Sequence, residues 1–481
     1  MTSAQHIGHK PWMLLAVAAG LALATTSGRA GETASPPAAA TPPAAVTPPV
    51  AISAPVAPIS ELVLPPIPSG APTIVPVDRP ITVKEAVAAA LEHQSQIAIA
   101  AANAAAAAGR TRQALSAYFP TLSLSAEHNR IGPAATGGTG AVGGRFTVGG
   151  YTTSIAGTQL IYDFGKTPSQ VGQARQSEES ALDSLAQTRQ DTVNQVKQAY
   201  YSLLQNQRLV EVQRSNVASQ RAHLDEARAR FTAGVAPRAD VVTAETALAS
   251  ATFNLATAQN TAAVSRVTLN TALGIDVRTP VIVQQAEEPA PAVTPATLVE
   301  EALARRRDIA QLRAQVSAAE NALRAARTTN LPDLLLVGAY GLRGGTFPGD
   351  TRSWSYGVSL QWPFFDVGVT RGGIEVARAN VQGARAQLIQ GEQTASSEVV
   401  QAYLNVQTAA QKVTSAAAEV ANAEESVRVA TGRYQAGVAI YIEVIDAQTA
   451  QVTARTDQTN ALYGLSIARA ALTRALGLEE Q

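Results

Sequence analysis

The strongest constraint on this chain is an internal duplication with a spacing of about 203 residues. RFTAGVAPRADVVTAETAL at residues 230–248 aligns without a gap with RYQAGVAIYIEVIDAQTAQ at residues 433–451. The same register places Asp163 on Asp366 and, near the C-terminus, Gly477 on a matching glycine. A tandem duplication of this kind predicts one structural unit that is used twice in each chain.

Composition excludes several function classes. The chain has 481 residues, 15% of them charged, and a formal net charge of zero. Nucleic-acid binders carry a basic excess or basic runs, so we expect no nucleic-acid partner. The sequence contains no cysteine, which excludes disulfides, thiolate zinc sites and thiol catalysis.

The first 80 residues are predicted to lie outside the folded unit. Residues 1–30 combine His9 and Lys10, an apolar run over 12–24 and a small residue at Ala30, which predicts a secretory signal peptide. A membrane anchor is the alternative. Residues 31–80 are rich in proline and alanine, which predicts a disordered leader. No other run approaches the ~18–20 apolar residues of a membrane-spanning helix.

Each half of the remaining chain predicts the same element order: a helix, two strands, a very long helix and a helix of half that length. Repeat 1 covers residues 81–275, a proline-rich linker covers 276–296, and repeat 2 covers 297–481. In repeat 1 we expect a helix over 83–117, strands over 121–126 and 154–163 around a glycine-rich loop at 132–150, and helices over 168–233 and 238–273. In repeat 2 we expect a helix over 298–329, strands over 333–341 and 355–365, a long helix that ends at 435 and a helix over 441–476.

Apolar residues recur every seven positions along both long helices, which predicts left-handed coiled-coil packing. The companion position three residues further on is weaker, as the residues from Leu185 to Ala227 show, so each helix is expected to have a narrow seam and much polar surface. Such helices suit a ring around water better than a solid bundle, although a two-stranded coiled-coil hairpin is also compatible with the stripe. In repeat 1 the stripe consists of Leu182, Arg189, Val196, Leu203, Val210, Val217, Leu224 and Phe231, and all but the arginine are apolar or aromatic. In repeat 2 it consists of Arg385, Glu392, Val399, Val406, Val413, Val420, Val427 and Tyr434, of which the last six are apolar or aromatic.

Helix lengths predict where the turns lie. The long helix has about 66 residues and therefore spans ~100 Å. The returning helix and the leading helix of the next repeat together match that length. We therefore expect all strands at one end of the unit and both helical turns at the other.

Aromatic residues mark the strand end, because 13 of the 22 fall within residues 118–164 and 340–365. Alternating strands of ~10 residues with flanking aromatics are typical of outer-membrane barrels, although a soluble β-patch is also enriched in aromatics. Four strands cannot close a barrel, and lipid does not tolerate an open edge. The predicted fold is therefore mainly α with a small β part, a long α-helical barrel continuous with an outer-membrane β-barrel, both closed only in the oligomer. The expected membrane-interface aromatics are Tyr118, Phe119, Tyr162, Phe164, Trp354, Trp362, Phe364 and Phe365.

Taken in order, and found twice, these features resemble the TolC-like outer membrane factor family, also called outer membrane efflux proteins, over roughly residues 80–478. The resemblance rests on the strand starts at Phe119-Pro120 and Leu331-Pro332, the corners Tyr162-Asp163-Phe164-Gly165 and Phe365-Asp366-Val367-Gly368, and the two Arg-x-x-x-Gly-Val turns. It implies a homotrimer with twelve strands in the outer membrane and a helical tunnel in the periplasm. The implied function is the exit duct of a tripartite efflux or type I secretion system.

The resemblance also implies roles for the residues of the turns. The tips that meet a periplasmic adaptor, and through it an inner-membrane pump, would be Arg230, Gly234, Val235 and Ala236 with Arg433, Gly437, Val438 and Ala439. The periplasmic gate would involve Tyr434, Glu443, Asp446 and Asp240. Some relatives have an arginine latch where this chain has Ala439, and Arg238 is a speculative substitute. Without the resemblance, the acids read as solvated residues at a helix N-terminus.

The sequence shows no group of residues that predicts a catalytic, metal or cofactor site. The GxGxxG spelling at 138–143 follows no buried strand and opens no helix, so it does not predict a dinucleotide site. His93, His128 and His223 lack partners at ligand spacing and are expected at the surface. We therefore expect no catalytic residue, no metal, no cofactor and no enzyme activity. A periplasmic adaptor or a coiled-coil scaffold is the alternative function, and drug, metal and protein cargoes are not distinguished.

Overall fold

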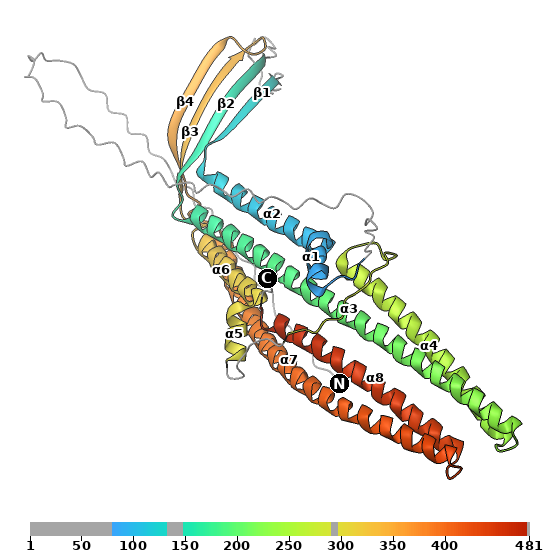
Figure 1. Cartoon of the computed structure of the whole chain (residues 1–481). Helices are drawn as coiled ribbons and strands as arrows, with labels where there is room; N and C mark the ends of the chain where they lie inside the picture. The colour runs from blue at the N-terminus through green and yellow to red at the C-terminus, as the bar shows by residue number, and fades with distance from the viewer. Residues whose placement is uncertain (1–78, 132–147, 290–296, 479–481) are drawn as a thin grey trace, which may run out of the picture. The chain divides into compact units, whose positions relative to one another are not determined.

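The computed structural model describes residues 79–131, 148–289 and 297–478, in which long helices join one four-stranded antiparallel sheet (Figure 1). This confirms the predicted fold class. The predicted signal peptide, nearly all of the leader and most of the glycine-rich loop lie outside the described residues. The elements are α1 (Val83–His93), α2 (Ser95–Leu115), η1 (Ser116–Tyr118), β1 (Thr121–Ile131), β2 (Val148–Tyr162), α3 (Lys166–Thr232), α4 (Arg238–Leu273), α5 (Leu298–Arg305), α6 (Arg307–Arg327), β3 (Asp333–Gly344), β4 (Thr351–Gln361), α7 (Val369–Gln435) and α8 (Tyr441–Ala475).

The sheet has the order β1-β2-β3-β4, so β1 and β4 are edge strands. Successive side chains alternate between the two faces of a strand. The antiparallel register places apolar side chains of neighbouring strands on one face and hydroxyl side chains on the other. One face is therefore apolar and exposed, while the opposite face is rich in hydroxyl side chains. The apolar face carries Leu122, Leu124, Ile155, Leu336, Tyr340, Trp354, Tyr356, Val358 and Leu360. The hydroxyl face carries Thr121, Ser123, Ser125, Ser154, Thr158, Ser353, Ser355 and Ser359.

An aspartate turns the chain from strand to helix in each repeat. The carboxylate of Asp163 accepts hydrogen bonds from the backbone N–H groups of Gly165 and Thr167 at the start of α3. Asp366 repeats the contact for Gly368 and Thr370 at the start of α7, at 3.1 and 2.8 Å. These bonds satisfy N–H groups that a helix N-terminus leaves free. The duplicated corner thus fixes where each long helix begins.

The sequence analysis expected one continuous leading helix in repeat 1. The structure instead divides it into α1 and α2, with a break at Gln94. The backbone there is extended, with ψ of 118°. The Gln94 side-chain amide donates to the carbonyls of Thr271 and Ala272 at the end of α4. Gly274 follows with φ of 72°, and its α-carbon packs against the His93 carbonyl so closely that a side chain would not fit. The break therefore places the Gln94 amide where it caps the end of the returning helix.

Repeat 2 has the same break at Arg306, where a single helix was again expected. Arg306 has ψ of 128°, and its guanidinium donates to the carbonyl of Ala475 at the end of α8. The side chain is 6% exposed and forms ion pairs with Asp308 at 2.6 Å and Glu398 at 2.8 Å. Gly477, with φ of 66°, lies against the Arg306 backbone. Each returning helix therefore ends against the leading helix of its own repeat.

The linker packs against the start of the described chain. Ile81 forms a parallel bridge with Val283. The hydroxyl of Tyr200, on α3, donates to the carbonyls of Ile81 and Gln284, both at 2.7 Å. Linker and leading segment are thereby held against the middle of the long helix.

The seven-residue stripe is buried in the central part of α3, whereas in α7 Val399 and Tyr434 are buried and the four valines between them are half-buried. Val196 and Leu203 in α3 and Val399 in α7 are at most 1% exposed, whereas Leu182 and Phe231 near the helix ends are exposed. The companion position, expected to be weaker because it is less apolar, is equally well buried through small residues. Its buried members are Thr192, Ala199, Gln220 and Ala227 in α3, and Ala395, Ala402, Ala416, Ala423 and Ala430 in α7. Among the helices of the described residues, none has the length and apolarity needed to cross a membrane.

The seam yields a stability test. Val399→Asp places a charge at a site that is 0% exposed, and we expect it to lower the free energy of unfolding by about 3 kcal/mol or more. Asn405→Asp adds the same group at an exposed position of α7 and serves as the matched control. Urea melts of the detergent-solubilised protein, followed by helical circular dichroism, measure both. Equal midpoints for the two variants would contradict the seam.

Candidate functional site at the hairpin tips

Both helical turns have the same backbone. The N–H of Val235 donates to the carbonyl of Arg230 at 3.0 Å, and the N–H of Val438 donates to that of Arg433 at 3.0 Å. The glycines before these valines, Gly234 and Gly437 in the predicted tip sets, have φ of 76° and 74°. This left-handed conformation is available to glycine without strain. The duplicated Arg-x-x-x-Gly-Val pattern is thus a pair of matched helix-ending turns.

The tips expose apolar side chains. Val235 is 74% exposed and Val438 is 68% exposed, while Ala236 and Ala439 beside them are half-buried. Ile440, which the sequence analysis missed, is 65% exposed. An apolar residue between the tip valine and the helix start was the available signal. Each tip thus exposes apolar area, Val235 on the first and Val438 with Ile440 on the second, which suits contact with a partner protein.

A hydrophobic cluster behind the tips joins the two hairpins. Repeat 1 contributes residues of α3 and α4, and repeat 2 contributes residues of α7 and α8, so both turns lie at the same end of the helices, as expected. The cluster removes apolar area from water only while the two hairpins stay together. Its buried members are Leu224, Ala227, Ala244, Ala430, Tyr434, Tyr441, Val444 and Ala447.

Tyr434 is the contact point between the hairpins. Its side chain is 9% exposed, and its hydroxyl donates to Oδ2 of Asp240 on α4 at 3.4 Å. The guanidinium of Arg230, from α3, lies 4.6 Å from the ring centroid and forms an ion pair with Glu226 at 3.0 Å. Burial, followed by the charge of Asp240, raises the pKa of Tyr434. The tyrosine therefore remains a neutral donor to the carboxylate.

Tyr441 supports this contact from α8. Its ring centroid lies 5.4 Å from that of Tyr434. The side chain is 4% exposed, and burial raises the pKa of Tyr441 to about 12. The Tyr441 hydroxyl has no hydrogen-bond partner within the described residues. The two rings form an aromatic layer that fills the space between the repeats.

Glu443 and Asp446 occupy neighbouring turns on one side of α8, because residues three apart share a helix face. Arg433 pairs with Glu443 at 3.0 Å, and both side chains are exposed to solvent in part. Asp446 is exposed and, within the described residues, forms no ion pair. Of the four predicted gate residues, the structure brings Tyr434 and Asp240 together, whereas Glu443 pairs with Arg433 and Asp446 is exposed one turn further along α8. Arg238 is exposed and, in the described part of the chain, pairs with no acid.

His223 is half-buried, so its expected surface position was wrong. Its ring contacts the amide of Gln448 on α8, whose Oε1 accepts from Nε2 of Gln220 on α3. Burial lowers the pKa of His223, and Glu226, with an oxygen 3.9 Å from Nδ1, acts in the opposite direction. Sequence periodicity missed these contacts because polar residues on a seam look like solvent-facing residues. His93 and His128 are exposed, as expected.

The predicted interface aromatics lie at the two ends of the sheet, and every one is at least 44% exposed. Trp354 belongs to the end where β3 turns into β4, and Tyr356 stacks on it with ring centroids 5.8 Å apart. The other seven lie at the end where strands join helices. These are Tyr118, Phe119, Tyr162, Phe164, Trp362, Phe364 and Phe365.

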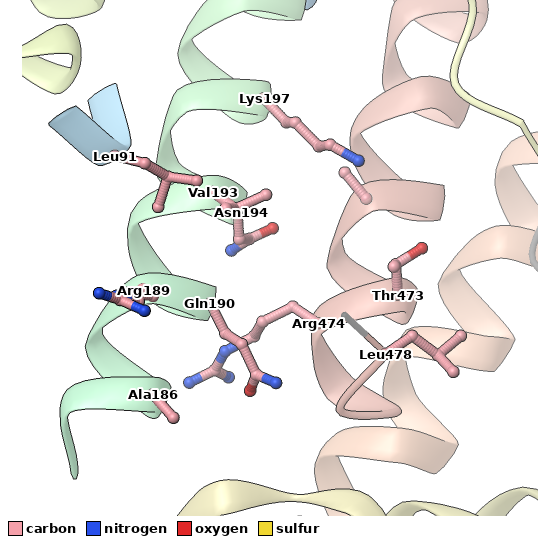
Figure 2. A pocket seen from close by; sticks show the side chains of 11 residues that line it. Leu91, Ala186, Arg189, Gln190, Val193, Asn194, Lys197, Thr473, Arg474 and Leu478 are labelled. Atoms are coloured by element: carbon pink, nitrogen blue, oxygen red, sulfur yellow. The ribbon is translucent and has the colours of Figure 1, made fainter. Parts of the chain in front are cut away.

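A small cavity of about 210 Å³ lies beside the middle of α3. Figure 2 shows α3 and α8 contributing side chains to it, among them Gln190 and Arg474. Arg474 pairs with Asp191 and Glu398, and Lys197 pairs with Glu288. Because these cations are neutralised by acids of the same chain, the cavity is best explained as part of the helix packing. Within the described residues, no three His, Asp or Glu side chains gather as a metal site would require.

Comparison with known proteins identifies this architecture. The family model for outer membrane efflux proteins matches residues 86–275 and 298–478. Protein CyaE of Bordetella pertussis is 28% identical over 419 residues, 84% of each chain, and outer membrane protein OprJ of Pseudomonas aeruginosa is 30% identical over 188 residues, 38% of each chain. Among solved structures, the outer membrane channel CmeC of Campylobacter jejuni superposes with a TM-score of 0.75 at 17% identity, covering 82% of this chain and 85% of that one. With both repeats matched, the chain belongs to the outer membrane efflux protein family.

Proposed function

We propose that three copies of this chain form a passive exit duct of an efflux or type I secretion system. As a family member, the chain is an outer membrane protein whose helices form a periplasmic tunnel. This decides against the alternative of an adaptor or a scaffold. The proposal rests above all on a sheet with two unpaired edges, one apolar face and one hydroxyl face.

Unpaired edges require a partner strand in lipid. Each edge strand, β1 and β4, has 11 residues, and its outward-facing backbone groups find no partner strand among the described residues. In hydrocarbon such groups cost several kcal/mol each. If β4 of one copy pairs with β1 of the next, three copies close a ring of twelve strands. The apolar face then meets lipid and the hydroxyl face lines the pore.

The orientation of the ring follows from the corners. Asp163 and Asp366 direct the chain into the long helices at one end of the sheet, so that end faces the periplasm. The β3–β4 turn then lies at the outer side of the membrane. The two aromatic groups, one at each end of the strands, match the girdles found at lipid interfaces.

The pore lining makes the duct passive. Its serine and threonine side chains hold water without strongly favouring one class of cargo, and the proposal assigns no catalytic step and no cofactor to this chain. Transport energy would come from an inner-membrane pump that is connected through a periplasmic adaptor. The proposed units remain repeat 1 at residues 81–275, the linker at 276–296 and repeat 2 at 297–481.

Adaptor contact is assigned to the tips. Val235, Val438 and Ile440 expose apolar area that a helical hairpin of an adaptor would cover. Docking would compete with the cluster that holds the two repeats together. The Tyr434–Asp240 hydrogen bond lies directly behind this surface. We therefore assign Tyr434, Asp240 and Arg230 to the closed state and the adaptor to the open state.

Closure of the sheet can be tested by cross-linking, since the chain has no native cysteine. Ser125→Cys in β1 and Ser355→Cys in β4 lie three strand spacings apart within one chain, ~14 Å. A bismaleimide shorter than that distance joins them only between copies. We expect a covalent trimer on a denaturing gel from the double variant, and none from either single variant. A double variant that stays monomeric while its thiols react would contradict the ring.

Gating can be tested at the tyrosine. Tyr434→Phe removes the hydroxyl that donates to Asp240, which weakens the closed state by about 1 kcal/mol per chain. We expect the open probability in planar bilayers to rise about fivefold or more. Tyr403→Phe makes the same change on α7, where the hydroxyl accepts a hydrogen bond from Nε2 of Gln407 and, among the described residues, contacts no acid. If the two variants behave alike, Tyr434 has no role in the gate.

The acids can be tested through block by a divalent cation. Three copies of Glu443 and Asp446 bring six carboxylates near one axis, a geometry that attracts cations. Asp446→Asn is expected to weaken block of the current by Mg²⁺ several-fold, because it removes half of that charge. Asp457→Asn lies on the same face of α8, ~17 Å further from the tip, and is the control. Unchanged block in Asp446→Asn would remove the acid ring from the mechanism.

A further inference from the structure

The apolar face of the sheet becomes basic at one end. Along β1 this face carries Leu122, Leu124 and then His128 and Arg130, and along β4 it carries Arg352 directly before Trp354. The register places all of these on one side, since each pairs with a residue of the same face. The basic end is the end of the β3–β4 turn, opposite to the helices. We call Arg130 and Arg352 the basic rim.

Local contacts confirm which way the β1 side chains point. A side chain at Gly149, opposite Arg130 in β2, would meet Cγ of Arg130 at 3.8 Å and Cε1 of His128 at 3.9 Å. The His128 ring also stacks on Tyr151 with centroids 4.3 Å apart. Both basic side chains therefore cross the apolar face of β2.

No acid of the described strands lies on the face of the rim, and Asp350, in the β3–β4 turn beside Gly344, forms no ion pair with either arginine. Arg130 and Arg352 are exposed and enter no ion pair among the described residues. The acids of those strands, Glu127 and Asp333, lie on the hydroxyl face by alternation, and Asp333 pairs with Lys166. A third arginine provides a contrast, because Arg343 lies on the hydroxyl face and donates to Oγ1 of Thr152.

Ring closure concentrates this charge. Arg130 is on one edge strand and Arg352 on the other, so each junction between copies in the proposed trimer would bring two guanidinium groups onto neighbouring strands. Like charges on neighbouring strands destabilise a sheet unless an anion lies between them. Phosphate oxygens match the planar donors of arginine in a bidentate geometry.

We propose that the basic rim binds the phosphate groups of the glycolipid headgroup in the outer leaflet, that is, of bisphosphorylated lipid A. This inference rests on the proposed function for its orientation and for the junction. The apolar face meets the acyl chains, and Trp354 and Tyr356 lie at the membrane–water interface, which sets how deeply the strands are inserted. The arginine stems run over apolar surface while their charged ends reach the headgroups. One site forms at each junction between copies.

The test uses the full-length oligomer in mild detergent and fluorescent bisphosphorylated lipid A as the probe. The variant is Arg130→Gln/Arg352→Gln, and Arg343→Gln is the control with the same change on the opposite face. Near a membrane surface each arginine strengthens the binding of an anionic lipid about fivefold. We therefore expect the double variant to bind about 25-fold more weakly and the control to bind like wild type. Dephosphorylated lipid A should bind equally weakly to all three proteins.

The outcomes separate this inference from the duct itself. Equal binding of phosphorylated lipid by wild type and the double variant, or an equal loss in Arg343→Gln, overturns the lipid site. So does a wild type that does not distinguish the two lipids. A lipid result of this kind leaves a cross-linked, conducting trimer intact. Conversely, rim-dependent binding by a protein that fails to cross-link would overturn the trimeric duct and retain the basic rim as a lipid-binding surface.

Discussion

Unsatisfied backbone groups on β1 and β4 are the constraint on which the rest of this structure depends. A four-stranded sheet with an apolar face can be stable in lipid only when both edges find partner strands. Within the described residues the chain does not provide those partners, because its four strands form this one sheet and the other elements are helices. Oligomerisation is therefore a condition for membrane insertion, and the long helices are carried into the same ring because each begins directly at a strand end.

The ends of the returning helices also leave backbone groups without partners, and each repeat provides the missing donors at the same position. The returning helices α4 and α8 stop midway along the long helices, where their last carbonyl groups need donors. Gln94 supplies an amide in repeat 1 and Arg306 supplies a guanidinium in repeat 2. The two side chains differ, but both come from a break in the leading helix and both face a glycine that follows the returning helix. Duplication has preserved the geometry while the chemistry changed.

This comparison shows how far sequence reasoning reaches. Repetition of the turn around Gly234 and Gly437, the aromatic strands and the seven-residue stripe predicted the order of elements, with α4 placed to the residue. The break at Gln94 could not be predicted, because an alanine-rich segment has high helix propensity on both sides and the cause is a contact with residues 271–272. Tertiary contacts of this kind leave no local pattern.

The candidate site shows the same division. Position in the repeat singled out Tyr434 and Asp240, which the structure joins by a hydrogen bond. His223 was misplaced, because nothing in its neighbours along α3 shows that Gln448 of α8 lies across from it. The exposed Ile440 was overlooked because its counterpart in the first turn is Pro237, so the repeat alignment did not mark it as apolar.

The strength of the polar contacts along the long helices indicates where the helices separate at the lowest free-energy cost. Midway, Lys197 and Glu288 form an ion pair at 2.7 Å with both side chains at most 5% exposed, and Tyr201 donates to the same carboxylate at 2.6 Å. Separating one partner of such a buried pair costs about 3–5 kcal/mol. At the tips the repeats are joined by the buried cluster around Tyr434 and Tyr441, and the one hydrogen bond within it, from Tyr434 to Asp240, is longer and worth about 1 kcal/mol. The polar contacts are therefore weaker at the tips than midway, and the proposed gate would separate the helices at the tips first.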